Sequence, residues 1–412
     1  MMKFVDLPQK LSWKTILPKI EPNICCLLLR DDEHYLIGWG VKDHYNASDH
    51  SFTLKDFQDF ISKHKQEYKL GYFGYDLKNV VEPQLSSQNR DQLGFPDTFW
   101  FIPENILICS GGNCMYSGKE DLNEILNAGI PNSNFQHHQI DLEPFTNKEN
   151  YLKHVDQILQ HIQRGDIYEV NYCVNFSSPG EIDPVQTFIK LNENAQAPFS
   201  SFFGFEGKHI LSASPERFIQ KTGDQLISQP IKGTARRDSD PLTDQHLANQ
   251  LQLDKKERSE NVMIVDLVRN DLSKLAKKNS VEVPELFTVH TFKTVHQLIS
   301  TVQCEVKEGT TEADILNALF PMGSMTGAPK FSAMTIAEEQ EDFKRGVYSG
   351  AIGVFHPNGN FDLNVVIRSI LYNSVEKVIS ASVGGAITIN SDPLSEYKEC
   401  LIKLEALQKA LC

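Results

Sequence analysis

Two apolar segments joined by an Asn-Gly turn place the strongest constraint on the fold of this chain. Residues 348–355 and 361–372 flank the sequence Pro-Asn-Gly-Asn at 357–360. Asn-Gly is favoured in tight hairpin turns because both of its residues accept a positive φ. The two segments are therefore predicted to pair as antiparallel neighbours, without a crossover helix between them.

The rest of the chain repeats this arrangement and interleaves it with helices. Residues 24–29 and 35–39 predict a second hairpin, and helical patterns cover 54–64, 255–272 and about 391–410. The alternation does not follow a regular strand-helix-strand repeat. It predicts an α+β fold of large, mainly antiparallel sheets covered by helices.

A polar stretch over residues 112–145 is the best candidate for a domain boundary. We expect an N-terminal α+β region over 1–130, packed with the rest, and a second domain over 145–412. The second domain begins with a predicted helix. Its expected capping box joins Thr146 and Glu149, whose side chains would satisfy the first free N–H groups.

Composition narrows the class of protein. The 412 residues carry a formal net charge of −14, which argues against a nucleic-acid binder or a basic membrane-surface protein. The longest apolar run near the N-terminus, residues 24–29, is too short to cross a membrane, and no signal-peptide stretch precedes it. Eight scattered cysteines without a CxxC pair predict free thiols. We expect a cytoplasmic protein.

Two pairs of glutamates are the first candidates for chemistry. Glu257 and Glu260 are three residues apart in a predicted helix, so their carboxylates share one face. Glu396 and Glu399 repeat that spacing in the last helix, and Lys403 follows one turn later. Each pair alone is compatible with a solvated helix face. If the two helices meet, four carboxylates with no other ligand type would suit a hard cation such as Mg2+.

A glycine-rich segment before a helix is the second candidate. It spans residues 320–330 and reads Phe-Pro-Met-Gly-Ser-Met-Thr-Gly-Ala-Pro-Lys. Its glycines free backbone N–H groups and its hydroxyls add donors, which is typical of an anion-binding site. Its lysine is not placed as in a phosphate-binding P-loop. A plain turn before a helix is the alternative.

Three further features could hold a carboxylate. Tyr348 begins a glycine-punctuated strand, and Gly384 and Gly385 could present N–H groups where another strand ends. Arg368 lies in an apolar segment, where a guanidinium needs a partner such as a bidentate carboxylate. A buried salt bridge is the alternative for this arginine.

The last candidate is a lysine in residues 230–234, which read Pro-Ile-Lys-Gly-Thr. Gly233 lets the backbone turn or approach a ligand closely, and Thr234 adds a hydroxyl. Lys232 in such a place can lose its charge by desolvation and act as a nucleophile or base. A strand end with a surface lysine is the alternative interpretation of the same residues.

Taken in order along the chain, these motifs resemble those of the chorismate-utilising enzymes. That family includes the large subunits of anthranilate synthase and aminodeoxychorismate synthase and, more distantly, isochorismate and salicylate synthases. The resemblance covers about residues 145–410, whereas residues 1–130 resemble the family only loosely. It rests on residues 257–260 (Glu-Arg-Ser-Glu), 266–271 (Asp-Leu-Val-Arg-Asn-Asp), 323–330, 348–350 (Tyr-Ser-Gly), Arg368, and Asp392-Pro393 with Glu396 and Glu399.

The resemblance implies a fold and a set of roles. The expected fold packs the antiparallel sheets as a sandwich with helices on the outside. Chorismate is the implied substrate and Mg2+ the implied cofactor, with Glu257, Glu260, Glu396 and Glu399 around the metal. The implied substrate-binding residues are Thr234, Thr326, Gly327, Tyr348, Arg368, Gly384, Gly385 and Lys403.

Lys232 distinguishes the members of this family. In aminodeoxychorismate synthases the lysine is thought to attack C2 of chorismate before ammonia enters at C4, which gives 4-amino-4-deoxychorismate, the precursor of 4-aminobenzoate and folate. We expect burial and the metal to lower its pKa. The resemblance also implies a separate glutamine amidotransferase subunit that supplies ammonia.

Three alternatives remain open at this point. Anthranilate synthases form anthranilate and pyruvate and usually carry alanine at position 232. Isochorismate synthases carry a water-activating lysine where this chain has Glu169, and amination members usually carry glutamine there. A non-catalytic chorismate-binding subunit is the third. It is suggested by Gln297, which stands where the family commonly has a histidine, while His296 is one residue earlier and is expected to point the other way.

Overall fold

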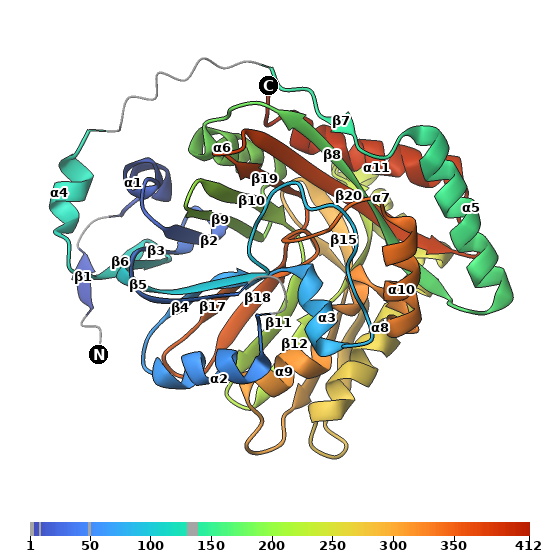
Figure 1. Ribbon diagram of the computed structural model, residues 1–412, viewed down its shortest axis with the longest axis horizontal. Helices are drawn as coiled ribbons and strands as arrows, with labels where there is room; N and C mark the ends of the chain where they lie inside the picture. Colours follow the sequence, from blue (N-terminus) through green and yellow to red (C-terminus); the bar gives the residue numbers. More distant parts are fainter. Residues whose placement is uncertain (1–3, 8–9, 48–50, 130–138) are drawn as a thin grey trace.

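The computed structural model describes residues 4–7, 10–47, 51–129 and 139–412 (Figure 1). Within these residues 20 strands form one hydrogen-bonded network, and every pairing of named strands is antiparallel. The predicted α+β class and antiparallel pairing are confirmed. No helix of the described residues is both long and apolar enough to cross a membrane.

The strands of the first half are β1 Val5–Leu7, β2 Cys25–Asp31, β3 His34–Ala47, β4 Lys69–Phe73, β5 Thr98–Ser110, β6 Asn113–Ser117, β7 Glu143–Pro144, β8 Glu169–Pro179, β9 Phe199–Phe205 and β10 Lys208–Ser214. Those of the second half are β11 Arg217–Thr222, β12 Gln225–Gln229, β13 Ile231–Arg236, β14 Glu282–Thr291, β15 Val295–Glu305, β16 Gly327–Ala328, β17 Ala351–Phe355, β18 Phe361–Val365, β19 Ser369–Asn373 and β20 Val378–Thr388.

The α-helices are α1 Trp13–Ile20, α2 Leu54–Lys63, α3 Lys78–Val81, α4 Leu122–Asn127, α5 Lys148–Arg164, α6 Pro184–Ala195, α7 Pro241–Leu253, α8 Lys255–Leu275, α9 Glu312–Leu319, α10 Lys330–Gln340 and α11 Pro393–Gln408. Two short 3-10 turns, η1 Tyr75–Leu77 and η2 Gly323–Met325, complete the regular structure. Most helices lie on the outside of the strands (Figure 1), as the resemblance implied.

Aromatic side chains join strands that are not neighbours in the ladder, which makes the sheet a sandwich. Tyr72 of β4 contacts Phe203 of β9 with 5.5 Å between ring centroids, and Phe99 of β5 contacts Phe205 at 4.5 Å. The adjacent Phe202 faces the opposite way and packs against Phe188 of α6, because successive side chains of a strand alternate between faces. One core therefore fills the space between sheet layers and extends under α2, α8 and α9, and a second lies under α1, α5, α6, α10 and α11.

Both predicted hairpins form, and the regions assigned to two domains share their strands. Strand β17 pairs with β18 across the Asn-Gly turn, and β2 pairs with β3. Strand β17 also pairs with β4, and β2 pairs with β9. The expected boundary stays a prediction, although the ladder crosses it at both places.

The prediction of one continuous strand over residues 361–372 is wrong for the middle of this segment. Residues 366–368 separate β18 from β19, and Arg368 adopts a φ of 52°. A positive φ at a residue with a side chain is unfavourable and interrupts the pairing of an extended strand. The break turns the arginine out of the ladder.

Three local expectations are also corrected. The cap of α5 is Asn147, whose side chain accepts a hydrogen bond from the N–H of Asn150, while the Thr146 hydroxyl donates to Asp342 instead. The polar stretch 112–145 contains β6 and α4 in its described part, and residues 130–138 of it lie outside the described residues. Cys109 and Cys114 form a disulfide, because the β5–β6 hairpin sets them directly opposite one another.

Candidate active site

One cavity of about 650 Å³ collects nearly all the residues singled out from the sequence. Its walls come from β13, the N-terminal turns of α8, strand β20 and α11, together with the segments around residues 324 and 368. The predicted residues that line it are Lys232, Thr234, Glu257, Glu260, Tyr348, Arg368, Gly384, Gly385, Glu396, Glu399 and Lys403.

The two glutamate pairs meet at this cavity because each stands near the capped start of its helix. Asp254 caps α8 and accepts the N–H of Glu257, and Asp392 caps α11 directly before Pro393. Between the two helices lies Lys256. Its Nζ is 3.4 Å from Glu396 Oε1 and 3.9 Å from Glu260 Oε1. The cation offsets the repulsion between the two groups of carboxylates.

Glu260 is the most perturbed of the four carboxylates. Burial raises its pKa to about 7, although Lys232 and Lys256 act in the opposite direction. Its Oε1 has no hydrogen-bond partner among the described residues. Burial also raises the pKa of Glu257. Two carboxyls near a helix start that both resist ionisation favour the approach of a cation.

The four carboxylates do not close around a single point. Within the described ranges no group of three or more His, Cys, Asp and Glu side chains is arranged to hold a metal ion. Mg2+ usually binds one or two carboxylates and completes its shell with water and substrate oxygens. The oxygen-only donors and the unpartnered Glu260 Oε1 fit such an open site, and the magnesium site stays a prediction.

Lys232 reaches the cavity from an irregular part of β13. The register of β13 on β15 shifts between Ile231 and Thr234, so Lys232 and Gly233 form a bulge. Gly233 has a φ of 84°, and a Cβ there would stand 3.0 Å from Glu257 Oε2. The positive φ requires glycine at this position. The bulge also changes the direction in which the neighbouring Lys232 side chain points. Lys232 Nζ donates a hydrogen bond of 2.9 Å to Glu169 Oε1.

The pKa of Lys232 is expected to fall through burial and through the metal; the structure tests the effect of burial, and the effect of the metal stays a prediction. Burial does lower this pKa, but the nearby carboxylates of Glu169, Glu260 and Glu216 outweigh burial and raise the pKa above its ordinary value. Opposite charges within a few ångströms favour the ammonium form. The lysine is therefore held as a cation, and it must give up a proton before it can act as a nucleophile.

Arg368 presents an uncommitted guanidinium to the cavity. None of the described residues accepts a hydrogen bond from it, so the alternative of a buried salt bridge is not realised with them. Burial lowers its pKa, against the opposing effect of Tyr348 and Glu399. A guanidinium in this state favours a carboxylate ligand that offers two oxygens.

The glycine pair of β20 and Lys403 form the neighbouring wall. Lys403 Nζ donates to the carbonyl oxygen of Gly384 at 2.6 Å and lies 2.7 Å from Glu399 Oε1. A Cβ on Gly385 would stand 3.5 Å from Glu396 Oε2. The missing side chain at Gly385 leaves space for a ligand between α11 and β20, whereas a Cβ on Gly384 would stand 2.6 Å from the carbonyl oxygen of Tyr172 on β8.

Thr326 and Gly327 do not line the cavity. The Thr326 hydroxyl donates to the carbonyl oxygens of Gly323 and Met322, at 3.1 and 3.3 Å, and so closes the η2 turn. Gly327 pairs with Val170 of β8. The preceding Ser324 and Met325 face the cavity instead.

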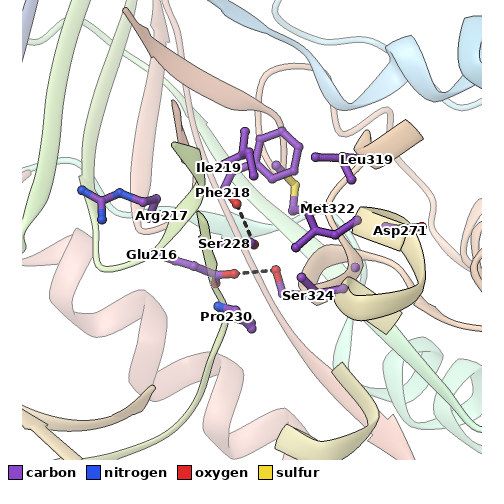
Figure 2. A pocket seen from close by; sticks show the side chains of 13 residues that line it. Glu216, Arg217, Phe218, Ile219, Ser228, Pro230, Asp271, Leu319, Met322 and Ser324 are labelled. Atoms are coloured by element: carbon purple, nitrogen blue, oxygen red, sulfur yellow. Dashed lines mark hydrogen bonds between the residues drawn. The ribbon is translucent and has the colours of Figure 1, made fainter. Parts of the chain in front are cut away.

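Sequence reasoning missed Glu216, which lies between β10 and β11 and lines the large cavity. Figure 2 shows it in the small pocket next to that cavity, with its carboxylate hydrogen-bonded to Ser324. Its Oε1 accepts a 2.5 Å hydrogen bond from the Ser324 hydroxyl, and burial raises its pKa to about 7. Behind it a cavity of only about 20 Å³ is walled mainly by apolar side chains, including Phe218 and Met322. A single glutamate after a proline at a strand end carries no spacing signal, so the sequence did not mark it.

The histidine and glutamine on β15 face opposite ways, as expected. Gln297 lines the cavity, and its Oε1 has no hydrogen-bond partner among the described residues. His296 is turned away and is held at 2.9 Å by both Asp244 Oδ1 and Thr291 Oγ1. His296 therefore does not take the place of the histidine that the family commonly has at the position of Gln297.

Comparison with known proteins decides the family. The model described as chorismate binding enzyme matches residues 23–409. The chain belongs to the chorismate-binding enzyme family. It is 36% identical over 351 residues to aminodeoxychorismate synthase component 1 of Escherichia coli (strain K12), covering 83% of this chain and 76% of that protein. It is 33% identical over 390 residues to the chloroplastic aminodeoxychorismate synthase of Arabidopsis thaliana, covering 88% of this chain but only 42% of that protein.

Solved structures of other proteins share the fold. Anthranilate synthase component I from Streptococcus pneumoniae TIGR4 superposes with a TM-score of 0.80 at 23% identity, over 91% of this chain and 92% of that one. The menaquinone-specific isochorismate synthase from Escherichia coli superposes with a TM-score of 0.81 at 16% identity, over 100% of this chain and 95% of that one. The expected sandwich architecture is confirmed.

Proposed function

We propose that this protein catalyses the Mg2+-dependent amination of chorismate by ammonia to 4-amino-4-deoxychorismate. The observation that carries the proposal is the position of Lys232, whose amine enters the same cavity as the two glutamate pairs and the free guanidinium of Arg368. A substrate bound in this cavity would be surrounded by a nucleophile (Lys232), a proton donor (Glu216) and a cationic group that can bind a carboxylate (Arg368). The similarity to aminodeoxychorismate synthases supports this assignment.

Chorismate carries two carboxylates, and the cavity offers separate anchors for them. Arg368 has the donors for one carboxylate, and the backbone of Gly384 and Gly385 lies open beside Lys403 for polar contact with the substrate. Glu257, Glu260, Glu396 and Glu399 would hold Mg2+, which supplies charge stabilisation at a substrate carboxylate and at the C4 hydroxyl.

Two groups of the chain move protons in this scheme. Lys232 must lose a proton so that Nζ can form a bond to C2 while the C4–O bond breaks. Glu216 has a pKa of about 7, so a large fraction of it is protonated near neutral pH. Its carboxylic acid can donate that proton to the departing C4 oxygen, which leaves as water.

We also propose that a separate glutamine amidotransferase subunit delivers the ammonia. The Escherichia coli relative is named component 1, and the plant relative is more than twice the length of the region that this chain matches. The expected result is turnover with ammonium salts by this chain alone, and turnover with glutamine only after a glutaminase subunit is added.

The deciding experiment incubates the protein with chorismate, Mg2+ and an ammonium salt and identifies the products by mass. The expected product is 4-amino-4-deoxychorismate, and a chelator should abolish its formation until Mg2+ is restored. Anthranilate with pyruvate, and no aminodeoxychorismate, would contradict the proposal in favour of anthranilate synthase. Chorismate binding without turnover under any ammonia source would favour a non-catalytic subunit.

A further inference from the structure

The carboxylate that holds Lys232 keeps one oxygen unused. The Glu169 side chain is 1% exposed and that of Lys232 is 11% exposed. Oε1 of Glu169 accepts the lysine hydrogen bond at 2.9 Å, whereas Oε2 is buried and has no partner among the described residues. Leaving a buried carboxylate oxygen unpaired costs stability. An arrangement that tolerates this cost indicates a role beyond holding the fold together.

The backbone fixes Glu169 more firmly than it fixes Lys232. Glu169 lies at the start of β8, between Ala328 of β16 and Thr388 of β20. Gly327 packs so closely that a Cβ there would stand 2.1 Å from the Glu169 carbonyl oxygen. Lys232, in contrast, stands in the bulge of β13, where the ladder is interrupted. The ion pair therefore joins two residues that differ in backbone support. The backbone of Glu169 is held between two strands, whereas that of Lys232 lies in a bulge.

Other charged groups face this amine, but none is bonded to it. Glu260 on α8 and Glu216 before β11 act on Lys232 through space. Glu216 is engaged by the Ser324 hydroxyl, and Glu260 Oε1 is approached by Lys256 at 3.9 Å. Of these carboxylates, Glu169 alone has an oxygen that already accepts the Lys232 proton in a hydrogen bond.

We propose that Glu169 is the positioning residue of Lys232, which aims the amine into the cavity and takes its Nζ proton when the nitrogen attacks the substrate. The proposal rests on the amination of chorismate proposed above. The unused Oε2 gives the carboxylate room to carry that proton while Oε1 stays close to Nζ. The carboxylate thus both holds the cation before the reaction and removes the charge that blocks nucleophilic attack.

Every proton that is transferred in this scheme is returned within one catalytic cycle or leaves with the water. In the first step Lys232 gives one proton to Glu169, Nζ bonds to C2, both ring double bonds shift, and the C4–O bond breaks as Glu216 protonates the leaving oxygen to water. In the second step ammonia bonds to C4, both ring double bonds shift back, and the C2–Nζ bond breaks. Glu169 then returns its proton to Lys232, and the new C4 ammonium returns one to Glu216. The net reaction is chorismate plus ammonia to aminodeoxychorismate plus water.

The test compares wild-type protein with Glu169→Gln, which keeps the size of the side chain and removes its charge. Glu181→Gln is the matched control, because Glu181 also pairs with a lysine, Lys377, but on the surface. The first measurement is the pH dependence of Lys232 acetylation by acetic anhydride, followed by mass spectrometry from about pH 7 to about pH 11. We expect the midpoint for Lys232 to fall in Glu169→Gln and to stay unchanged in Glu181→Gln.

The second measurement is the single-turnover rate at which chorismate becomes covalently attached to Lys232. We expect a loss of about 10²-fold in Glu169→Gln, the lower end of general-base effects, with the Kd for chorismate changed less than about threefold. Glu169→Asp, which keeps the charge on a shorter side chain, should recover part of the rate and the labelling midpoint. This variant also serves as the test if Glu169→Gln does not fold.

The outcomes separate this inference from the proposed function. An unchanged labelling midpoint, or a wild-type rate of attachment in folded Glu169→Gln, overturns the role of Glu169 and leaves amination intact. A wild-type protein that forms neither adduct nor aminodeoxychorismate overturns amination, and with it the catalytic half of this inference. Even then, the labelling midpoints decide whether Glu169 holds Lys232.

Discussion

Two buried ion pairs of this protein differ in how fully their hydrogen-bonding groups are used. Arg345 donates to Glu341 through Nε at 2.8 Å and also binds the carbonyl oxygens of Met325 and Asn171, at 2.8 and 2.7 Å. Its partner Glu341 accepts the N–H of Cys173 as well. The pair of Lys232 and Glu169 shares one hydrogen bond, and Glu169 Oε2 is left without a partner in the described structure.

The difference separates a pair that supports the structure from the pair for which we propose a role in the chemistry. Arg345 and Glu341 hold the backbone of Met325 and Asn171, and both of these residues line the cavity. A fully satisfied pair cannot accept a ligand without losing bonds that it already makes. Around Lys232, Gln297 Oε1 and the Arg368 guanidinium also have no hydrogen-bond partner among the described residues. The saturated pair supports the wall, and the unsaturated groups are available to a substrate.

The largest expected effect comes from removing the proposed nucleophile, Lys232. Lys232→Ala should abolish the covalent chorismate adduct and lower amination by on the order of 10³-fold or more, because no other amine replaces Nζ. The protein should stay folded, since Glu169 can accept a proton in place of its partner. Product analysis with trapping of the adduct checks this, and surface Lys377→Ala serves as the control. An adduct that persists in Lys232→Ala would refute the assignment.

Breaking the saturated pair should instead cost stability. Arg345→Met leaves Glu341 buried without its cation, which typically costs about 3–5 kcal/mol. Urea denaturation would measure the loss as a lower midpoint. The double variant Arg345→Met with Glu341→Met should recover much of it, because no buried charge then remains unpaired. Unchanged stability of Arg345→Met would remove the contrast between the two pairs.

The proton donor should give the reaction a characteristic pH dependence. The pKa of Glu216 is raised to about 7 by burial, so the acid form is present below that pH and is lost as the pH rises through it. The amination rate is expected to fall across this range. Glu216→Gln should lower the rate by about 10²-fold and remove this limb of the profile. A limb that survives in Glu216→Gln would assign the proton donor to another group.

The smallest effect should follow from filling the bulge beside Lys232. Gly233→Ala forces a side chain onto a φ of 84° and places a Cβ 3.0 Å from Leu251 Cδ1. We expect a loss of about 1–2 kcal/mol in unfolding free energy, from the left-handed backbone conformation. Gly359→Ala is the matched control, because it has a φ of 80° but no atom within 4 Å of its Cβ. A KM increase only in Gly233→Ala would show that the bulge shapes the cavity.

The sequence predicted elements well where neighbouring residues decide the structure. The Asn-Gly turn gave the β17–β18 hairpin, and Asp392-Pro393 marked the start of α11, where Asp392 accepts the N–H of Ser395. The three-residue spacing within each glutamate pair set both carboxylates toward one side of their helix. These features depend on contacts within one turn of helix or one hairpin, which a short stretch of sequence specifies.

Where the predictions were wrong, a contact that the sequence did not reveal decided the structure. Thr146 binds Asp342, nearly two hundred residues away, instead of capping its own helix. Cys109 and Cys114 pair only because a hairpin that the sequence did not reveal brings them together. In each case the residue type was compatible with the expected role, and tertiary contacts selected another.

By itself the sequence determined the antiparallel class of the fold, the family and most of the side chains that meet at the cavity. Only the tertiary structure decided the protonation of these side chains and the partner of each. Glu169 lies on β8 and Glu216 between β10 and β11, both outside the strand of Lys232, yet their charges help to reverse the effect of burial on its pKa. Such a shift depends on distances between side chains and on the water removed from around them, and neither quantity is encoded within a local stretch of residues.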